Sequence, residues 1–147
     1  MNQGPIKNLV DYAESLVQPL RVLVVDTELG SFEKVANALA PYDAEVFNAS
    51  CGCEACNCLQ KFAPFDLVFI GAPLKLFGTP SDIVDQIQRI SPGASVVIMA
   101  RNLDEEVGNL VDRGPFTFLK KNGNFDSDHI QRIAGHLNLK LRPSGKT

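Results

Sequence analysis

Short apolar runs alternate along this chain with stretches whose apolar residues recur every three or four positions. The runs at residues 20–28, 66–70 and 95–100 are rich in apolar and β-branched side chains, and the first of them ends in acidic residues. Such runs are typical of strands buried in a parallel sheet. Two further strands are predicted at residues 44–49 and 116–119.

The stretches between these runs predict helices. Apolar residues at positions 29, 32, 35, 36 and 39 form one helical stripe, and that helix is expected to stop near Pro41. A second helix is predicted over residues 52–62. Thr79 is placed to cap a third helix that has Pro80 in its first turn and ends before Pro92. Two more helices are predicted, over residues 103–112 and around residues 130–137.

Five strands that alternate with five helices predict an α/β fold with a parallel sheet covered on both faces. The flavodoxin-like, doubly wound (βα)5 arrangement with strand order 2-1-3-4-5 fits this count. Ligands of such sheets bind beyond the carboxyl ends of the strands. The residues at those ends are Asp26, Gly71, Ala100 and Lys121.

Composition limits the classes of protein that need to be considered. At 147 residues the chain fits one compact domain at residues 20–139, with a C-terminal tail at 140–147. A formal net charge of -3 gives no basic surface for nucleic acid or an anionic membrane. No apolar run approaches the roughly 18 residues that span a bilayer, and residues 1–5 lack the features of a signal peptide. We therefore expect a cytoplasmic protein without nucleic-acid or membrane partners.

Residues 1–19 carry an amphipathic pattern of their own. It is shorter than the three or four heptads that would indicate a coiled coil. This segment is expected to dock on its own domain as a helix, to continue a linker from a longer sensor protein, or to join two copies in a homodimer. Its apolar positions are Ile6, Leu9, Val10, Ala13, Leu16 and Val17.

The residues at the strand ends resemble a known pattern. Over roughly residues 20–137 the chain looks like the receiver domain of two-component response regulators. That family carries an acidic pair after the first strand, a phosphorylated aspartate after the third, Thr or Ser after the fourth, and Lys after the fifth. The corresponding residues here are Asp26 and Thr27, Gly71, Ala100, and Lys121 within Phe118-Leu119-Lys120-Lys121. Asn122 replaces the proline that usually follows the lysine.

The departures from this pattern imply a degenerate pseudo-receiver. Glycine has no side chain, so Gly71 cannot attack a phosphoryl group. With Thr27 neutral, Mg²⁺ would have too little negative charge for a dedicated site, and we expect neither a metal nor another cofactor. The neighbouring acids Asp66, Asp82 and Asp85 stand at the wrong strand end or on the following helix. Asp26 and Lys121 are expected either to pair as opposite charges at the end of the sheet or to form a residual anion or metal site.

The resemblance implies a signalling module that acts by protein–protein interaction rather than by phosphorylation. The expected partner is a histidine kinase or another signalling domain of a two-component phosphorelay. The expected interaction face is that of the fourth predicted helix and fifth strand, with Val107, Leu110 and Phe118. No set of nucleophile, base and oxyanion donor can be assembled from the sequence, so we expect no enzymatic activity.

A cysteine cluster leaves a second function open. Cys51, Cys53, Cys56 and Cys58 lie within eight residues, which admits zinc binding or a response to oxidants. A strong zinc signature pairs two separated knuckles, and this cluster spans one loop and one short helix. The alternative to the interaction module is therefore a sensor of a small molecule, a metal or redox state. It would use either these thiols or the cleft at the carboxyl ends of the strands.

Overall fold

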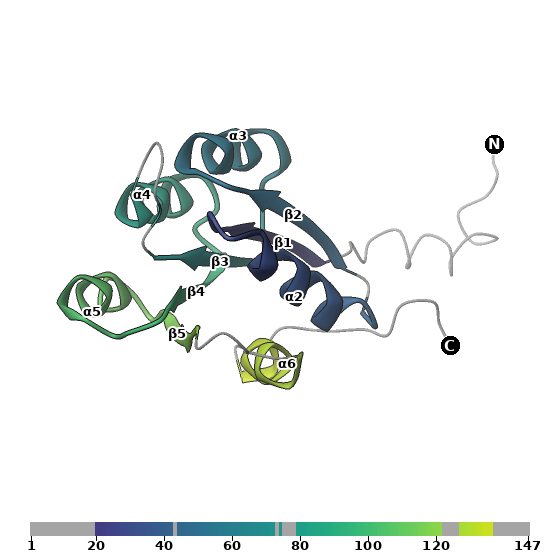
Figure 1. Ribbon diagram of the computed structural model, residues 1–147. Helices are drawn as coiled ribbons and strands as arrows, with labels where there is room; N and C mark the ends of the chain where they lie inside the picture. The colour runs from purple at the N-terminus through teal and green to yellow at the C-terminus, as the bar shows by residue number, and fades with distance from the viewer. Residues whose placement is uncertain (1–19, 43, 73, 75–78, 122–126, 137–147) are drawn as a thin grey trace.

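The computed structural model describes residues 20–42, 44–72, 74, 79–121 and 127–136 (Figure 1). The segment at residues 1–19, Asn122 and the tail at 140–147 lie outside this part of the chain. The strands are β1 (Leu20–Val25), β2 (Ala44–Ala49), β3 (Leu67–Gly71), β4 (Ser95–Ala100) and β5 (Thr117–Lys120). The helices are α2 (Leu29–Leu39), α3 (Gly52–Phe62), α4 (Pro80–Ile90), α5 (Glu105–Val111) and α6 (Ser127–His136).

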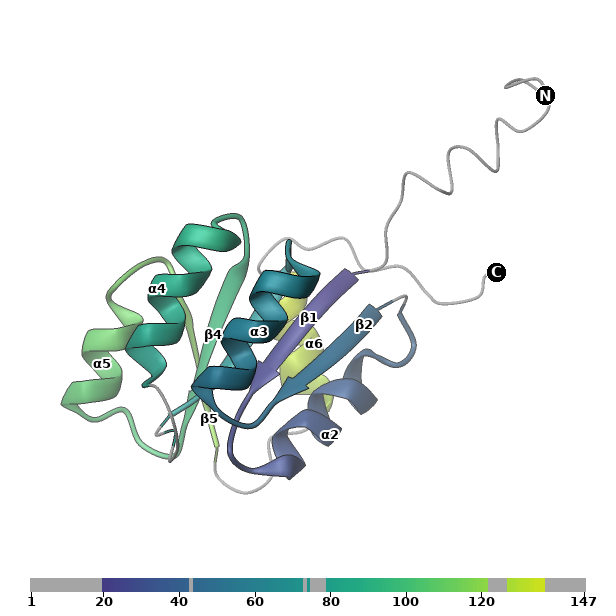
Figure 2. The ribbon, with the colours of Figure 1, turned by 90° about the horizontal axis from the view of Figure 1, so that it is seen from above.

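The strands form a single parallel sheet in the order β2-β1-β3-β4-β5. This confirms the predicted α/β class and the flavodoxin-like strand order. Figure 2 shows β1 and β2 side by side and pointing the same way, so that their carboxyl ends meet at one edge of the sheet. The chain segments that follow these strands therefore gather at that edge.

Alternate side chains of each strand enter two separate cores. One face of the sheet packs with Ala55 of α3, Val84 of α4 and Leu110 of α5. The opposite face packs with Val35 of α2 and Ile130 of α6. The sheet therefore lies between α3, α4 and α5 on one side and α2 and α6 on the other (Figure 1). Two-sided burial explains why the strands carry continuous apolar runs.

The helix ends follow from capping groups. The Thr79 hydroxyl accepts a hydrogen bond from Asp82 N, and the Asp82 carboxylate accepts one from Thr79 N, both at 3.1 Å, which confirms the predicted cap. Helix α5 begins at Glu105 rather than at residue 103, because the Asp104 carboxylate caps it by accepting from Val107 N at 2.9 Å.

Two leucines near these helix ends are exposed. Leu103 lies before the α5 cap and Leu29 is the first residue of α2, and each is 60% exposed. For Leu29 this differs from the expected buried stripe, because the first residue of the helix lies beyond the edge of the core. Among the described residues, no helix is long and apolar enough to cross a membrane.

Candidate functional site

Asp26 is the most enclosed acidic side chain at the carboxyl edge of the sheet. It follows β1 directly, is 3% exposed and has three hydrogen-bond donors. Its Oδ2 accepts from Lys121 Nζ at 2.7 Å and from Ser31 Oγ at 2.5 Å, and its Oδ1 accepts from Glu28 N at 3.1 Å. The carboxylate is thus neutralised and hydrogen-bonded on both oxygens, as a buried charge requires.

The chain course brings these donors together. Ser31 lies in the first turn of α2, which starts three residues after Asp26 in the sequence. Lys121 directly follows β5 and is 7% exposed, and its backbone N donates to the Ala100 carbonyl oxygen at 2.8 Å. The structure therefore places Asp26 and Lys121 in the contact that the sequence predicts. The role of Ser31 was not anticipated, because its hydroxyl belongs to no recognisable motif.

The Asp26 side chain also occupies the space above Gly71. A Cβ atom built on Gly71 would lie 2.4 Å from Asp26 Cγ and 2.6 Å from each of its carboxylate oxygens. Atoms do not approach so closely without a shift of one of them. The corner that the resemblance assigns to a phosphorylated side chain is therefore filled by the acid of the neighbouring strand.

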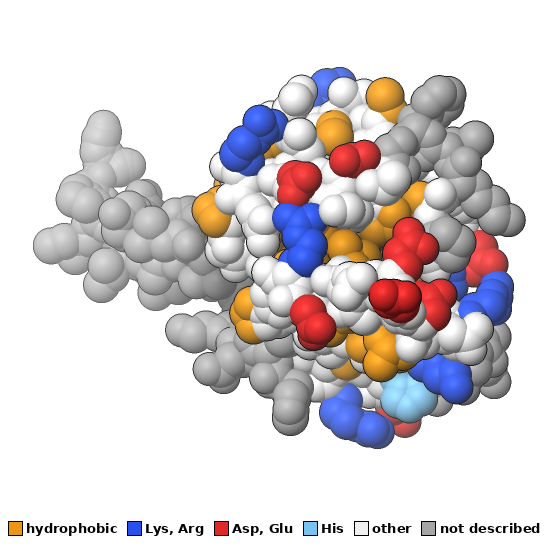
Figure 3. All heavy atoms as spheres, turned by 90° about the vertical axis from the view of Figure 1, so that its left-hand side faces the viewer, with side chains coloured by type: hydrophobic (Ala, Val, Ile, Leu, Met, Phe, Trp, Pro, Cys, Tyr) orange, Lys and Arg blue, Asp and Glu red, His pale blue; other side chains and the backbone are white. Residues whose placement is uncertain are grey.

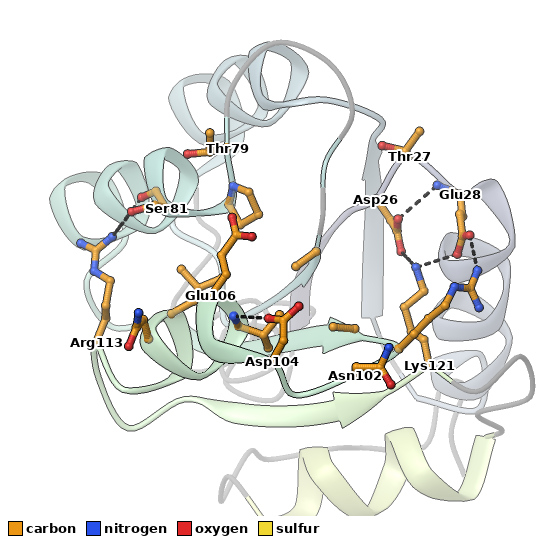
Figure 4. A pocket seen from close by; sticks show the side chains of 17 residues that line it. Asp26, Thr27, Glu28, Thr79, Ser81, Asn102, Asp104, Glu106, Arg113 and Lys121 are labelled. Atoms are coloured by element: carbon orange, nitrogen blue, oxygen red, sulfur yellow. Dashed lines mark hydrogen bonds and ion pairs between the residues drawn. The ribbon is translucent and has the colours of Figure 1, made fainter.

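A chain of ion pairs extends outward from Asp26 (Figure 4). Lys121 Nζ lies 2.6 Å from Glu28 Oε1, and Glu28 Oε2 lies 2.5 Å from Arg101 Nη2. The hydrogen bond from Lys121, with help from Arg101, lowers the pKa of the Glu28 carboxyl below its usual value of 4.5, although partial burial opposes the shift. The Glu28 carboxylate is thus favoured in its charged form by the Lys121 ammonium group. Arg101 lies in a loop, and no pattern in the sequence predicts its part in these ion pairs.

The donor set at this corner does not suit a divalent cation. Mg²⁺ requires several oxygen ligands in octahedral geometry, usually with one or two carboxylates. The nearby carboxylates of Asp26 and Glu28 both contact Lys121 Nζ, which occupies the position between them. Across the described ranges, no group of three or more His, Cys, Asp or Glu side chains is arranged to hold a metal ion. A divalent cation would have to displace the lysine.

The other acids considered from the sequence lie elsewhere. Asp66 stands at the opposite end of the sheet, where its Oδ2 accepts from Arg21 N at 2.9 Å. Asp82 closes the α4 capping box, and Asp85 forms an ion pair with Arg113. None of the three reaches the Asp26 corner.

Thr27 and Ala100, the remaining residues of the resembling pattern, line a cavity of about 700 Å³. Thr27 is half-buried, and Ala100 is the buried last residue of β4. The cavity runs from the Asp26 corner to the space between α4 and α5 (Figure 4). Its existence was not predicted in detail, since it depends on how far apart two helices pack.

The residues expected to form the interaction face, Val107, Leu110 and Phe118, do not form an exposed surface patch. Val107 and Leu110 are 5% and 6% exposed and pack against the sheet. Phe118 on β5 is half-buried against the same core. The family resemblance suggested this contact face, whereas here Val107 and Leu110 belong to the core-facing stripe of α5. A partner on this side of the molecule would therefore meet other side chains of α5 and β5.

The cysteine cluster lies on α3 and its N-cap. Cys51 is buried at the cap, Cys53 is exposed, and Cys56 and Cys58 are half-buried; all four are free thiols. Burial raises the pKa of Cys56 and of Cys58 above the usual value of 9.0, with the neighbouring Cys53 adding to the effect at Cys56 and Glu54 at Cys58. These two thiols are therefore protonated at neutral pH, which disfavours metal binding and oxidation.

Comparison with known proteins finds similarity in structure alone. The sequence matches no protein-family model, and no curated protein matches it significantly. The signal receiver domain of an HD domain-containing protein from Pseudomonas fluorescens superposes with a TM-score of 0.67 and 18% identity, over 82% of this chain and 97% of that one. A response regulator from Thermotoga maritima gives 0.66 and 25% identity, over 83% and 99%.

The response regulator DrrB of Thermotoga maritima, an OmpR/PhoB homolog, superposes with a TM-score of 0.66 and 18% identity, over 82% of this chain. This chain spans only 54% of DrrB, so it corresponds to one part of that protein. The fold is therefore that of response-regulator receiver domains, as the resemblance implied.

Proposed function

We propose that this chain is a receiver-like signalling module that acts through protein–protein interaction in a two-component type of pathway and is not phosphorylated. The observation that carries the proposal is the Asp26 carboxylate in the space above Gly71. Phosphoryl transfer to a carboxylate requires an accessible oxygen in line with the donor, and usually a metal ion. Gly71 offers no side-chain oxygen, and Asp26 is buried with both carboxylate oxygens engaged in hydrogen bonds.

The ion pairs of Lys121 with Asp26 and Glu28 favour a module that stays in a single conformational state. In a phosphorylated site, the lysine and the metal neutralise charge that comes and goes with the phosphoryl group. Here Lys121 is already engaged by Asp26 and Glu28. The module is therefore suited to constitutive binding of a histidine kinase or another signalling domain, or of a second copy of itself.

The contact surface on the α5 and β5 side would use exposed residues. Leu103, Glu105 and Lys120 are exposed there, whereas Val107 and Leu110 face inward, toward the core and the cavity between α4 and α5. We place the partner contact on these exposed side chains. The cysteines are less suited to a sensor function, because the pKa values of Cys56 and Cys58 are raised.

Intact-mass measurement after incubation with acetyl phosphate and Mg²⁺ tests the proposal. A phosphorylatable receiver treated in parallel shows that the reagent is active. We expect no phosphoryl adduct on this chain. A stoichiometric adduct that disappears in Asp26→Asn, but persists in the matched control Asp66→Asn at the opposite edge of the sheet, would overturn the proposal.

A further inference from the structure

The cavity at the carboxyl edge of the sheet has the size of a small-molecule binding site. It lies between the N-terminal end of α4 and helix α5, two helices that run side by side (Figure 2). Its volume of about 700 Å³ falls within the range of about 300–1,000 Å³ that is usual for small-molecule sites. Enough room is present for a ligand larger than a metal ion or a single phosphate.

The floor of the cavity is apolar. Ala72, Pro80, Ala100, Val107 and Leu110 contribute to its lining. Figure 3 shows apolar surface between charged side chains on the face that carries α4 and α5. A ligand that fills the cavity must therefore have an apolar body, because burying apolar surface supplies most of the affinity in such sites.

The cationic side chains of the cavity wall are already neutralised. Lys121 contacts Asp26 and Glu28, and Arg101 contacts Glu28. At the other end Arg113 pairs with Asp85 and donates to the Ser81 hydroxyl. An anionic ligand would have to compete with a carboxylate at each of these groups.

Two acidic side chains of the wall have no such compensation. Asp104 and Glu106 project from the start of α5 into the cavity (Figure 4). Among the described residues, the Asp104 carboxylate accepts a hydrogen bond from the backbone N–H of Val107, and neither Asp104 nor Glu106 forms an ion pair with a Lys or Arg side chain there. The wall therefore presents negative charge above an apolar floor.

We propose that this cavity binds an amphiphilic organic cation, with an apolar body against Val107 and Leu110 and an ammonium or amidinium group beside Glu106. The site is independent of the interaction function proposed above. A charged hydrogen bond to a carboxylate beside a buried apolar contact gives both affinity and orientation.

Benzamidine and its neutral isostere benzamide test this proposal in isothermal titration calorimetry on the full chain. We expect saturable binding of benzamidine and much weaker binding of benzamide, because only the first carries a positive charge. Glu106→Gln should weaken benzamidine binding about tenfold, as expected for loss of a charge-assisted hydrogen bond. The matched control is Glu105→Gln, which removes the same charge from the next residue of α5, outside the cavity lining.

Several results would overturn the proposal. They are no saturable binding of benzamidine, equal binding of benzamide, equal weakening by the two glutamine variants, or preferential binding of inorganic phosphate. The benzamidine and benzamide comparison needs only the wild-type chain, so it remains decisive if a variant folds poorly. Failure here would leave the acetyl phosphate result untouched.

Discussion

The Asp26 carboxylate occupies the space that a side chain at residue 71 would fill. The carboxylate cannot turn away without cost, because Ser31, Lys121 and the backbone of Glu28 all donate hydrogen bonds to it. When a buried carboxylate loses a hydrogen-bond donor, the free-energy cost of its desolvation is no longer offset. The absence of a side chain at Gly71 therefore leaves the space that the hydrogen-bonded Asp26 carboxylate occupies.

The substitution Gly71→Ala should destabilise the fold by about 1–3 kcal/mol, the usual cost of overpacking a tight site. The added Cβ would meet Asp26 Cγ at 2.4 Å and force the carboxylate off its donors. Urea unfolding followed by circular dichroism measures the change.

Gly108→Ala is the matched control for that measurement. Gly108 lies inside α5, and a Cβ added there meets nothing within 4 Å. Alanine is favoured over glycine in a helix interior, so this variant should gain about 0.5–1 kcal/mol. A Gly71→Ala protein as stable as wild type would show that Asp26 moves freely.

The elements themselves follow from local patterns in the sequence. The bounds of β2, β4 and α3 agree with the predicted ranges, because each run is delimited by residues that end an element. β3 and β5 are displaced by one residue toward the carboxyl end, where pairing with β4 decides the register. α5 is shorter than predicted, because periodicity marks a core-facing stripe while the Asp104 cap decides where the helix starts.

Helix α3 gives a prediction about thiol chemistry. Cys53 is exposed, while burial raises the pKa of Cys56 and Cys58, so these two carry less thiolate at neutral pH. With Ellman's reagent at pH 7 we expect Cys53 to react first and Cys56 and Cys58 to react slowly. Raising the pH should speed the slow phase.

Single substitutions assign the two phases. Cys53→Ser should remove the fast phase, whereas Cys58→Ser should leave it in place. A fast phase that survives in Cys53→Ser, or zinc that protects all four thiols, would favour the sensor alternative.

In the whole molecule, Asp26 and Lys121 join the segments that follow β1 and β5, which are 95 residues apart in sequence. Strand β3 and strand β4 lie between β1 and β5 in the sheet. The ion pair therefore closes the carboxyl edge across the centre of the fold. Removing one partner would leave the other charge buried.

Lys121→Met should cost about 3–5 kcal/mol in the free energy of unfolding, because it leaves the Asp26 carboxylate buried without its cation. Lys120→Met is the matched control, since Lys120 is the exposed neighbour on β5 and should change stability by less than about 0.5 kcal/mol. Chemical denaturation of both variants gives the comparison. Equal effects of the two substitutions would mean that the ion pair contributes little.

The sequence predicts which residues lie at the site, because that follows from the order of the strands, but it does not predict how their side chains are arranged. Parallel strand order brings Asp26, Gly71, Ala100 and Lys121 to one edge, and the structure places them there. Side-chain direction and loop conformation are decided by packing. The lean of Asp26 over Gly71 and the reach of Arg101 to Glu28 therefore became visible only in three dimensions.

Every glycine codon is one base change away from an aspartate or a glutamate codon, so a carboxylate at residue 71 is one mutation away in genetic terms. In steric terms that route is blocked, because the first atom of the new side chain already overlaps Asp26. Placing a phosphate acceptor at residue 71 would require Asp26 to move aside and Lys121 to be released in the same step. For the non-phosphorylated module that we propose, this arrangement makes the state hard to reverse by a single substitution at residue 71.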